Sequence, residues 1–126
     1  MKIWLISVVI LALTVFFGIS TEKYFDHSSQ RLLPYLKNVE LDINRENWSQ
    51  AKSQLNQFKQ QWQQEKKVWY ILTNHREIDF IEESLSKLTK AVNYQGKIEA
   101  QIELGIISHF LNHVPERERL NSTNIF

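Results

Sequence analysis

The chain has no cysteine among its 126 residues, and it contains only three glycines and two prolines. The first absence excludes disulfide bonds, and it excludes a lipid anchor attached to a cysteine. The scarcity of glycine and proline removes most of the usual turn signals, so the sequence predicts long helices with short connections. Three glycines also cannot supply a glycine-rich phosphate loop.

A charge excess of either sign is missing as well. Without Lys2, the 15 basic side chains become 14, which equals the 14 acidic ones. No basic block marks a nucleic-acid or anionic-lipid surface. No serine lies in a nucleophile elbow, and the adjacent carboxylates Glu82 and Glu83 point in different directions on a helix. We therefore expect no enzymatic activity.

What the sequence does have is an uncharged, strongly apolar run over residues 3–19. Seventeen helical residues span roughly 25 Å, which is near the lower limit for crossing a bilayer. Lys2 precedes the run, and no excess of positive charge follows it. The positive-inside rule then predicts that residues 1–20 form a single-pass anchor in the cell membrane, with the N-terminus in the cytoplasm and residues 21–126 extracytoplasmic.

A cleaved signal peptide is the competing interpretation of the same segment. The residues Gly18-Ile19-Ser20 resemble a small-x-small cleavage site. Against it, the apolar run is longer than the usual central region of a signal peptide, and no Ala-x-Ala sequence follows. We therefore favour the membrane anchor.

Residues 47–73 have the clearest helical pattern in the chain. Apolar side chains recur there in alternating steps of three and four residues, which is a heptad-like stripe. Its members are Trp48, Ala51, Leu55, Phe58, Trp62, Trp69 and Leu72. Only Glu65 interrupts the stripe, at a position of the core type. Asn47 and Gln50 have the spacing of an N-terminal capping pair.

Three further amphipathic helices are predicted. A helix over about 29–43 would use Leu32, Leu36, Val39 and Ile43, and Pro34 would either kink it or lie near its first turn. A helix over about 75–94 would begin at the Asn74–Glu77 capping pair and use Ile78, Ile81, Leu85, Leu88 and Val92. A helix over about 98–114 would use Ile102, Ile106 and Phe110.

Together these elements predict an all-α protein in which a transmembrane helix precedes a small antiparallel bundle of about four helices. Three tetratricopeptide-like helix pairs would also fit the length. The stripe over 47–73 is too long for such repeats, so we favour the bundle.

Histidines suggest a possible metal site. His109 and His113 are four residues apart on one predicted helix, and His75 and Asp79 have the same spacing on the preceding one. A hairpin about Gly96 would bring the two pairs within about one helical turn, because Asp79 and His113 are equally distant from it. Three imidazoles and a carboxylate would suit a divalent transition metal such as zinc.

A structural explanation of the same histidines is stronger. His75 lies at a helix start, and His109 and His113 lie in a last turn, where partly charged imidazoles suit the helix dipole. His109 also lies off the apolar stripe through Ile106. We therefore expect no cofactor.

The segment 68–72 is apolar on all sides of its helix, which is more than one buried face requires. Trp69, Tyr70 and Leu72 are therefore candidates for contact with a partner protein or with the membrane, although deep burial is the favoured explanation. The polar C-terminal tail ends in Ile125 and Phe126, which either dock on their own domain or contact a partner.

The chain resembles an uncharacterised family of short, single-anchor membrane proteins from spore-forming Gram-positive bacteria. The resemblance rests on the short N-terminal span, Asn47-Trp48, Trp62, Trp69, the segment 74–79 and the ending 124–126. It implies that the His75–Asp79 segment is a family feature and that a membrane-protein neighbour is a partner. It adds no mechanism, because the family has no assigned activity.

The sequence therefore predicts a membrane-anchored extracytoplasmic module that has a structural or interaction role. Its expected partners are the bilayer, through residues 3–19, and another membrane or envelope protein, but no nucleic acid. A metal-binding or metal-sensing domain using His75, Asp79, His109 and His113 is the alternative.

Overall fold

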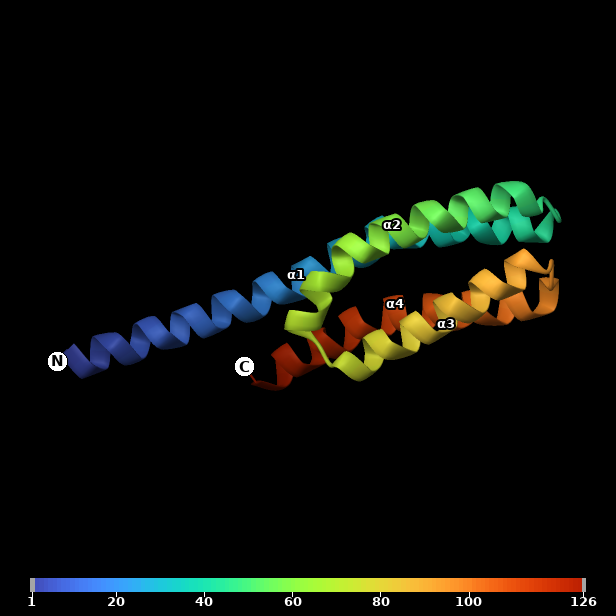
Figure 1. Ribbon diagram of the computed structural model, residues 1–126. Helices are drawn as coiled ribbons and strands as arrows, with labels where there is room; N and C mark the ends of the chain where they lie inside the picture. Colours follow the sequence, from blue (N-terminus) through green and yellow to red (C-terminus); the bar gives the residue numbers. More distant parts are fainter. Residues whose placement is uncertain (1, 126) are drawn as a thin grey trace.

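The computed structural model describes the backbone of residues 2–125 and the side chains of residues 2–113. This part of the chain forms four α-helices and no strand (Figure 1). The helices are α1 (Lys2–Asn44), α2 (Trp48–Leu72), α3 (His75–Asn93) and α4 (Lys97–Ile125). Helices α1 and α2 form one antiparallel hairpin, and α3 and α4 form a second one beside it. The predicted all-α class, an apolar N-terminal helix followed by a bundle, is confirmed.

Helix α1 is one continuous element that contains both the apolar run and the first helix of the bundle. Among the described residues, it is the one helix long and apolar enough to cross a membrane. Its first turns extend beyond the bundle as a stalk (Figure 1). Pro34 lies in the interior of this helix rather than near a first turn. Pro34 is exposed, and because proline has no N–H, the carbonyl of Gln30 does not receive the helical hydrogen bond that residue 34 would otherwise donate.

Short connections join the helices, as the sequence predicts. Asn47 caps α2 by accepting a hydrogen bond from the backbone nitrogen of Gln50, and Asn74 caps α3 by accepting one from Arg76. Gly96 lies in the turn before α4, where a side-chain carbon would come within 2.4 Å of the Tyr94 ring. These connections place each helix beside its sequence neighbour, and α4 packs against α1 to complete the bundle.

The core is built from the predicted stripes of the first three bundle helices. The buried apolar residues are Phe25, Leu32, Leu36, Val39 and Ile43 of α1, Ala51, Leu55, Phe58, Trp62 and Trp69 of α2, and Ile78, Ile81, Leu85, Leu88, Ala91 and Val92 of α3. Removing this apolar surface from water is the main force that holds the helices together, at about 25 cal/mol per Å².

The predicted buried stripe of the last helix is wrong. Ile102 and Ile106 are exposed, and Phe110 is only partly buried. The residues of α4 that enter the core are Ala100, Leu104, Ile107 and Leu111. This helix carries two apolar stripes, and the helices packed against it, α1 and α3, determine which of the two is covered.

Candidate functional site

A cluster of polar side chains surrounds Glu65 between α1 and α2. The Tyr24 hydroxyl and the Ser28 hydroxyl donate hydrogen bonds to Oε2 of Glu65 at 2.7 and 2.8 Å. Arg31 donates from Nε to Oε1 at 2.8 Å and from Nη2 to Oε2 at 3.1 Å. The Glu65 side chain is only 13% exposed. We call Tyr24, Ser28, Arg31 and Glu65 the Glu65 cluster.

Both tryptophans that flank Glu65 on the α2 stripe also use their indole nitrogens. Trp69 Nε1 donates to the buried Ser28 hydroxyl at 2.7 Å. Trp62 Nε1 donates to Oε1 of Glu82 on α3 at 3.2 Å, and Lys66 forms an ion pair with the same oxygen at 2.6 Å. Polar bonds at this level therefore connect α2 to both α1 and α3.

The environment shifts the pKa values of three members of the cluster, Tyr24, Glu65 and Arg31, and the hydrogen bond to Glu65 raises the pKa of Arg31. Burial raises the pKa of the Tyr24 hydroxyl to about 12, and the hydrogen bond to the Glu65 carboxylate acts in the same direction. Burial also tends to raise the pKa of the Glu65 carboxyl. The hydrogen bonds from Arg31, Tyr24 and Ser28 together outweigh this effect and hold that pKa below its usual range.

The Glu65 cluster is suited to holding α1 and α2 together rather than to acid–base chemistry. Both carboxylate oxygens already accept hydrogen bonds, and the lowered pKa disfavours taking up a proton. Such a carboxylate is a poor general base and instead fixes α2 against α1. In the sequence, Glu65 stands out only as a break in the apolar stripe. That break was the available signal, but its partners on α1 lie 34 to 41 residues earlier in the chain.

The histidine-based metal site is not assembled in the structure. No group of three or more His, Asp or Glu side chains within residues 2–113 is arranged to hold a metal ion. His75 Nε2 lies 3.0 Å from the Tyr70 carbonyl oxygen, and Asp79 is exposed. His109 and His113 do come together, because their rings stack with centroids 5.5 Å apart.

Two phenylalanines explain why the four predicted ligands do not converge. The α3–α4 hairpin forms as predicted, but at this level its contact is a stack of Phe80 on Phe110, with ring centroids 5.4 Å apart. Asp79 and His109 each precede one of these rings, and successive helical residues point about 100° apart. The helices are therefore neighbours, while the predicted ligands are directed elsewhere.

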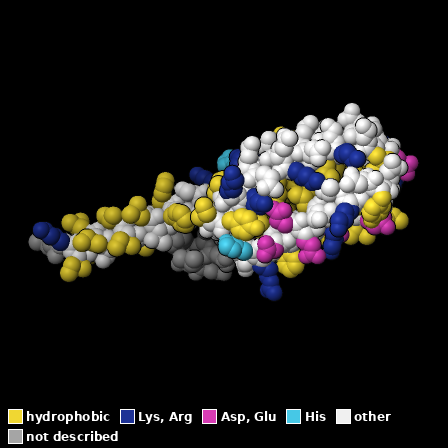
Figure 2. Space-filling model, viewed as in Figure 1, with side chains coloured by type: hydrophobic (Ala, Val, Ile, Leu, Met, Phe, Trp, Pro, Cys, Tyr) yellow, Lys and Arg dark blue, Asp and Glu magenta, His cyan; other side chains and the backbone are white. Residues whose placement is uncertain are grey.

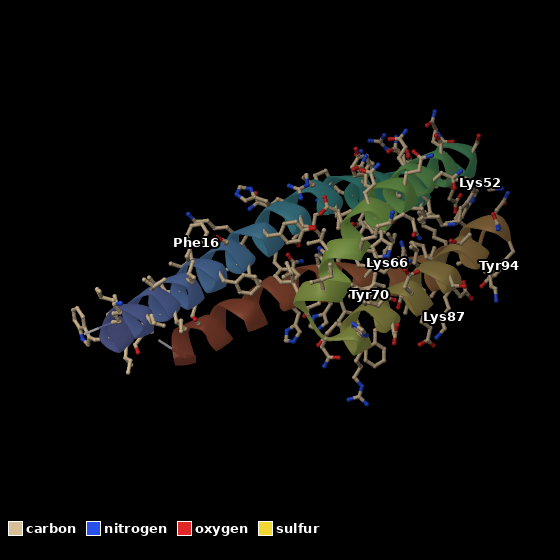
Figure 3. The ribbon with its side chains drawn as sticks, turned by 60° about the vertical axis from the view of Figure 1, so that its left-hand side comes forward. Phe16, Lys52, Lys66, Tyr70, Lys87 and Tyr94 are labelled. Atoms are coloured by element: carbon tan, nitrogen blue, oxygen red, sulfur yellow. The ribbon has the colours of Figure 1, made fainter. Side chains whose placement is uncertain are left out.

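Some side chains of segment 68–72 are buried in the core, and others are exposed at the surface. Trp69 is fully buried and makes edge-to-face contacts with Phe25 and Trp62, at centroid distances of 5.1 and 5.4 Å. Tyr70 and Leu72 are partly buried, whereas Ile71 is 82% exposed. Figure 3 shows Tyr70 at the end of α2 that lies nearer the stalk. The candidate contact residues Ile125 and Phe126 lie outside the described side chains.

Comparison with known proteins gives a family without an assigned activity. No curated protein and no solved structure matches the chain. One family does match, and the match starts at residue 19, where the apolar run ends. It covers residues 19–125 and thus includes the whole described bundle with the Glu65 cluster. The chain therefore belongs to DUF4363, a family described as a domain of unknown function.

Proposed function

We propose that this protein is a membrane-anchored helical module whose membrane-facing end contacts another membrane or envelope protein. In this proposal residues 3–19 cross the bilayer, the N-terminus is cytoplasmic and the bundle is extracytoplasmic. Apolar side chains cover the stalk, while the bundle surface is mixed in character (Figure 2). Lipid would cover the exposed apolar residues of the stalk, which water would otherwise disfavour.

The continuity of α1 supports a structural role. A flexible linker would let the bundle turn freely relative to its anchor, but here the span and the bundle share one helix. The Glu65 cluster lies within the first few turns after the apolar run and fixes α2 to this helix. The bundle therefore has no flexible linker about which it could turn relative to its anchor, and this supports a module that positions a contact surface.

The observation that carries the proposal is the exposure of Ile71 at the stalk end of the bundle. Its side chain is 82% exposed, and Val68, one turn earlier, is 37% exposed. Isolated exposed aliphatic side chains are ordinary, but these two belong to an apolar segment whose other members are buried in the core or pack against it. A membrane protein that rises just above the bilayer would meet this surface first.

Site-specific photo-crosslinking in cells tests the proposal. A photoreactive amino acid at Val68 should form an adduct with another membrane protein, whereas one at Tyr94, at the opposite end of the bundle (Figure 3), should form none. Ile71→Asp should abolish the Val68 adduct without unfolding the bundle, because the side chain is exposed.

Leu41→Asp is the matched control, because Leu41 is another exposed aliphatic residue, near the end of α1. This variant should leave the Val68 adduct intact. An adduct that survives Ile71→Asp, or an equal yield from Tyr94, would contradict a contact at the membrane-facing end.

Of the observations that favoured the alternative function, metal binding, only one agrees with the structure. His109 and His113 remain a pair on one helix. Two imidazoles are fewer than the three or four protein ligands that zinc sites use. The pair needs ligands from outside the described chain before it can form such a site.

A further inference from the structure

The outer face of α4 carries a second apolar stripe that nothing in the described bundle covers. Ile98 and Ile102 are 69% and 55% exposed, and Ile106 is also exposed. The positions 98, 102, 105 and 109 follow steps of four, three and four residues, which is the spacing of a coiled-coil seam. The stripe lies on the side of the helix opposite the core residues Ala100, Leu104 and Ile107.

Gly105, in the middle of this stripe, is not required by any close contact with the described side chains. A side-chain carbon added there would meet no atom within 4 Å, and its backbone is helical without a positive φ. Glycine in a helix interior is less stable than alanine by about 1 kcal/mol. Gly96 differs, because a side chain there would strike Tyr94. This glycine lowers the stability of the helix and is not explained by a contact within the described chain. The absence of a side chain there would allow another helix to approach closely.

The anchor determines how a second copy would meet this face. Two copies that span the same bilayer in the same direction are related by a rotation axis along the membrane normal, so their α4 helices run parallel. Each residue of the stripe then faces its own equivalent. Ile98, Ile102 and Gly105 are uncharged, and the flanking positions Gln101, Ile106 and Ser108 are uncharged too, whereas Glu99 at the start of the helix is acidic. Parallel pairing therefore brings apolar surface together, with one acidic flanking side chain from each copy.

We propose that two copies of this chain pair in parallel along the outer face of α4 and share a transition-metal site made of His109 and His113 from each copy. The inference rests on the proposed membrane anchor, which aligns the copies. His109 continues the seam, and its ring already stacks on that of His113. One copy supplies two imidazoles, whereas two copies supply four, which is the number that a tetrahedral zinc site takes. The site is thus incomplete in a single chain.

Cysteine crosslinking of the full-length chain in detergent micelles tests both parts of the proposal. The chain has no natural cysteine, so Ile102→Cys gives a single reactive position. With a short bismaleimide it should form a crosslinked dimer, and Lys52→Cys, on the exposed side of α2, should not. Zinc chloride should lower the dissociation constant of the dimer by about tenfold or more relative to the chelated sample.

Two variants separate the contributions. His109→Ala with His113→Ala should abolish the effect of zinc but keep the zinc-independent crosslinking. Gly105→Leu should block crosslinking while the circular dichroism spectrum stays helical, because the position faces open space.

Three results would overturn the proposal. They are an uncrosslinked Ile102→Cys chain with and without zinc, equal crosslinking of Lys52→Cys, and a dimer whose dissociation constant does not respond to zinc. None of these depends on the Val68 adduct described above. Failure of the dimer and failure of the membrane-protein contact are therefore distinguishable.

Discussion

At the scale of single residues, Glu65 shows how a charged side chain is accommodated in a mostly apolar interface. Its ion pair with Arg31 adds little by itself, because the Arg31 side chain is 51% exposed and water screens it. The hydrogen bonds from Tyr24 and Ser28 are more sheltered, and Trp69 donates to Ser28 in turn. Removing the carboxylate leaves these hydroxyl groups without their acceptor.

We therefore expect Glu65→Ala to lower the free energy of unfolding by about 1–3 kcal/mol, the usual cost of leaving buried polar groups unsatisfied. Glu83→Ala is the matched control, because Glu83 is exposed and pairs only with Lys87 on its own helix. It should change stability by less than about 0.5 kcal/mol. Urea unfolding of the full-length protein in detergent measures both. Equal effects would show that the Glu65 cluster contributes nothing specific.

The same carboxylate makes stability depend on acid. Since the pKa of Glu65 is lowered in the folded state, its contribution is present above the pKa of the unfolded chain and is lost as the pH falls through the folded pKa. Glu65→Gln should remove this part of the acid-induced loss of stability. A pH series of urea midpoints for the two proteins tests this, and curves of the same shape would contradict it.

Tyr24 makes the corresponding prediction at alkaline pH. Its folded pKa is raised from 10.0 to about 12, so its contribution to stability is complete below pH 10 and is lost as the pH rises toward 12. Ultraviolet titration should show a tyrosinate transition near pH 12 that Tyr24→Phe removes. Glu65→Gln should lower that midpoint, because it removes the carboxylate charge. A titration that Tyr24→Phe leaves unchanged would refute the assignment.

At the scale of the helices, α4 shows that periodicity does not always determine which face is buried. Ile102 and Ile106 form one apolar stripe, and Leu104 and Ile107 form another. The prediction from the sequence was the first stripe, although the aliphatic side chains of the two stripes are alike in size. Packing against α1 and α3 selects the second, and Ser29 on α1 donates a hydrogen bond to the Leu111 carbonyl.

Paired substitutions on α4 check this assignment directly. Ile107 is fully buried, so Ile107→Ala should destabilise the protein by about 2–4 kcal/mol through lost burial and the cavity left behind. Ile102→Ala should change the stability of the single chain by less than about 0.5 kcal/mol, because its side chain is more than half exposed. Thermal unfolding of dilute, chelated protein measures both effects. If Ile102→Ala destabilised the protein more than Ile107→Ala, the buried face of α4 would be the one that the sequence favoured.

The starts of α2 and α3 were predictable, because local signals decide them, whereas the predicted end of the last helix at about 114 is wrong, since α4 continues to Ile125. Asn47 and Asn74 begin α2 and α3 within a residue of the predicted positions, since caps act locally. The continuity of α1 was not predictable, because Pro34 alone permits either a break or an exposed interior position. The Glu65 cluster needs the pairing of α1 with α2, and the sequence predicted that pairing without its register. Long-range register was thus the missing information.

At the scale of the whole molecule, one helix serves both as the candidate anchor and as a central part of the bundle. The proposed topology places the bundle outside the cell membrane, with Lys52 near its distal end (Figure 3).

A membrane-impermeant maleimide should therefore label Lys52→Cys in intact cells, and the labelled chain should have full-length mass and remain in carbonate-washed membranes. The natural chain has no cysteine and is the unlabelled control. Labelling only after permeabilisation would reverse the topology. A shortened, released chain would favour a cleaved signal peptide.

The pairing of the first helix with the last sets the order in which the protein is able to mature. Ser29 and Leu111, which hydrogen-bond across this pairing, are 82 residues apart. Helix α1 is synthesised before α4. The α1 face that α4 covers therefore stays exposed to water until α4 has been made. A chain interrupted before α4 therefore leaves that apolar face of α1 exposed to water, where proteases and chaperones can recognise the chain as unfinished.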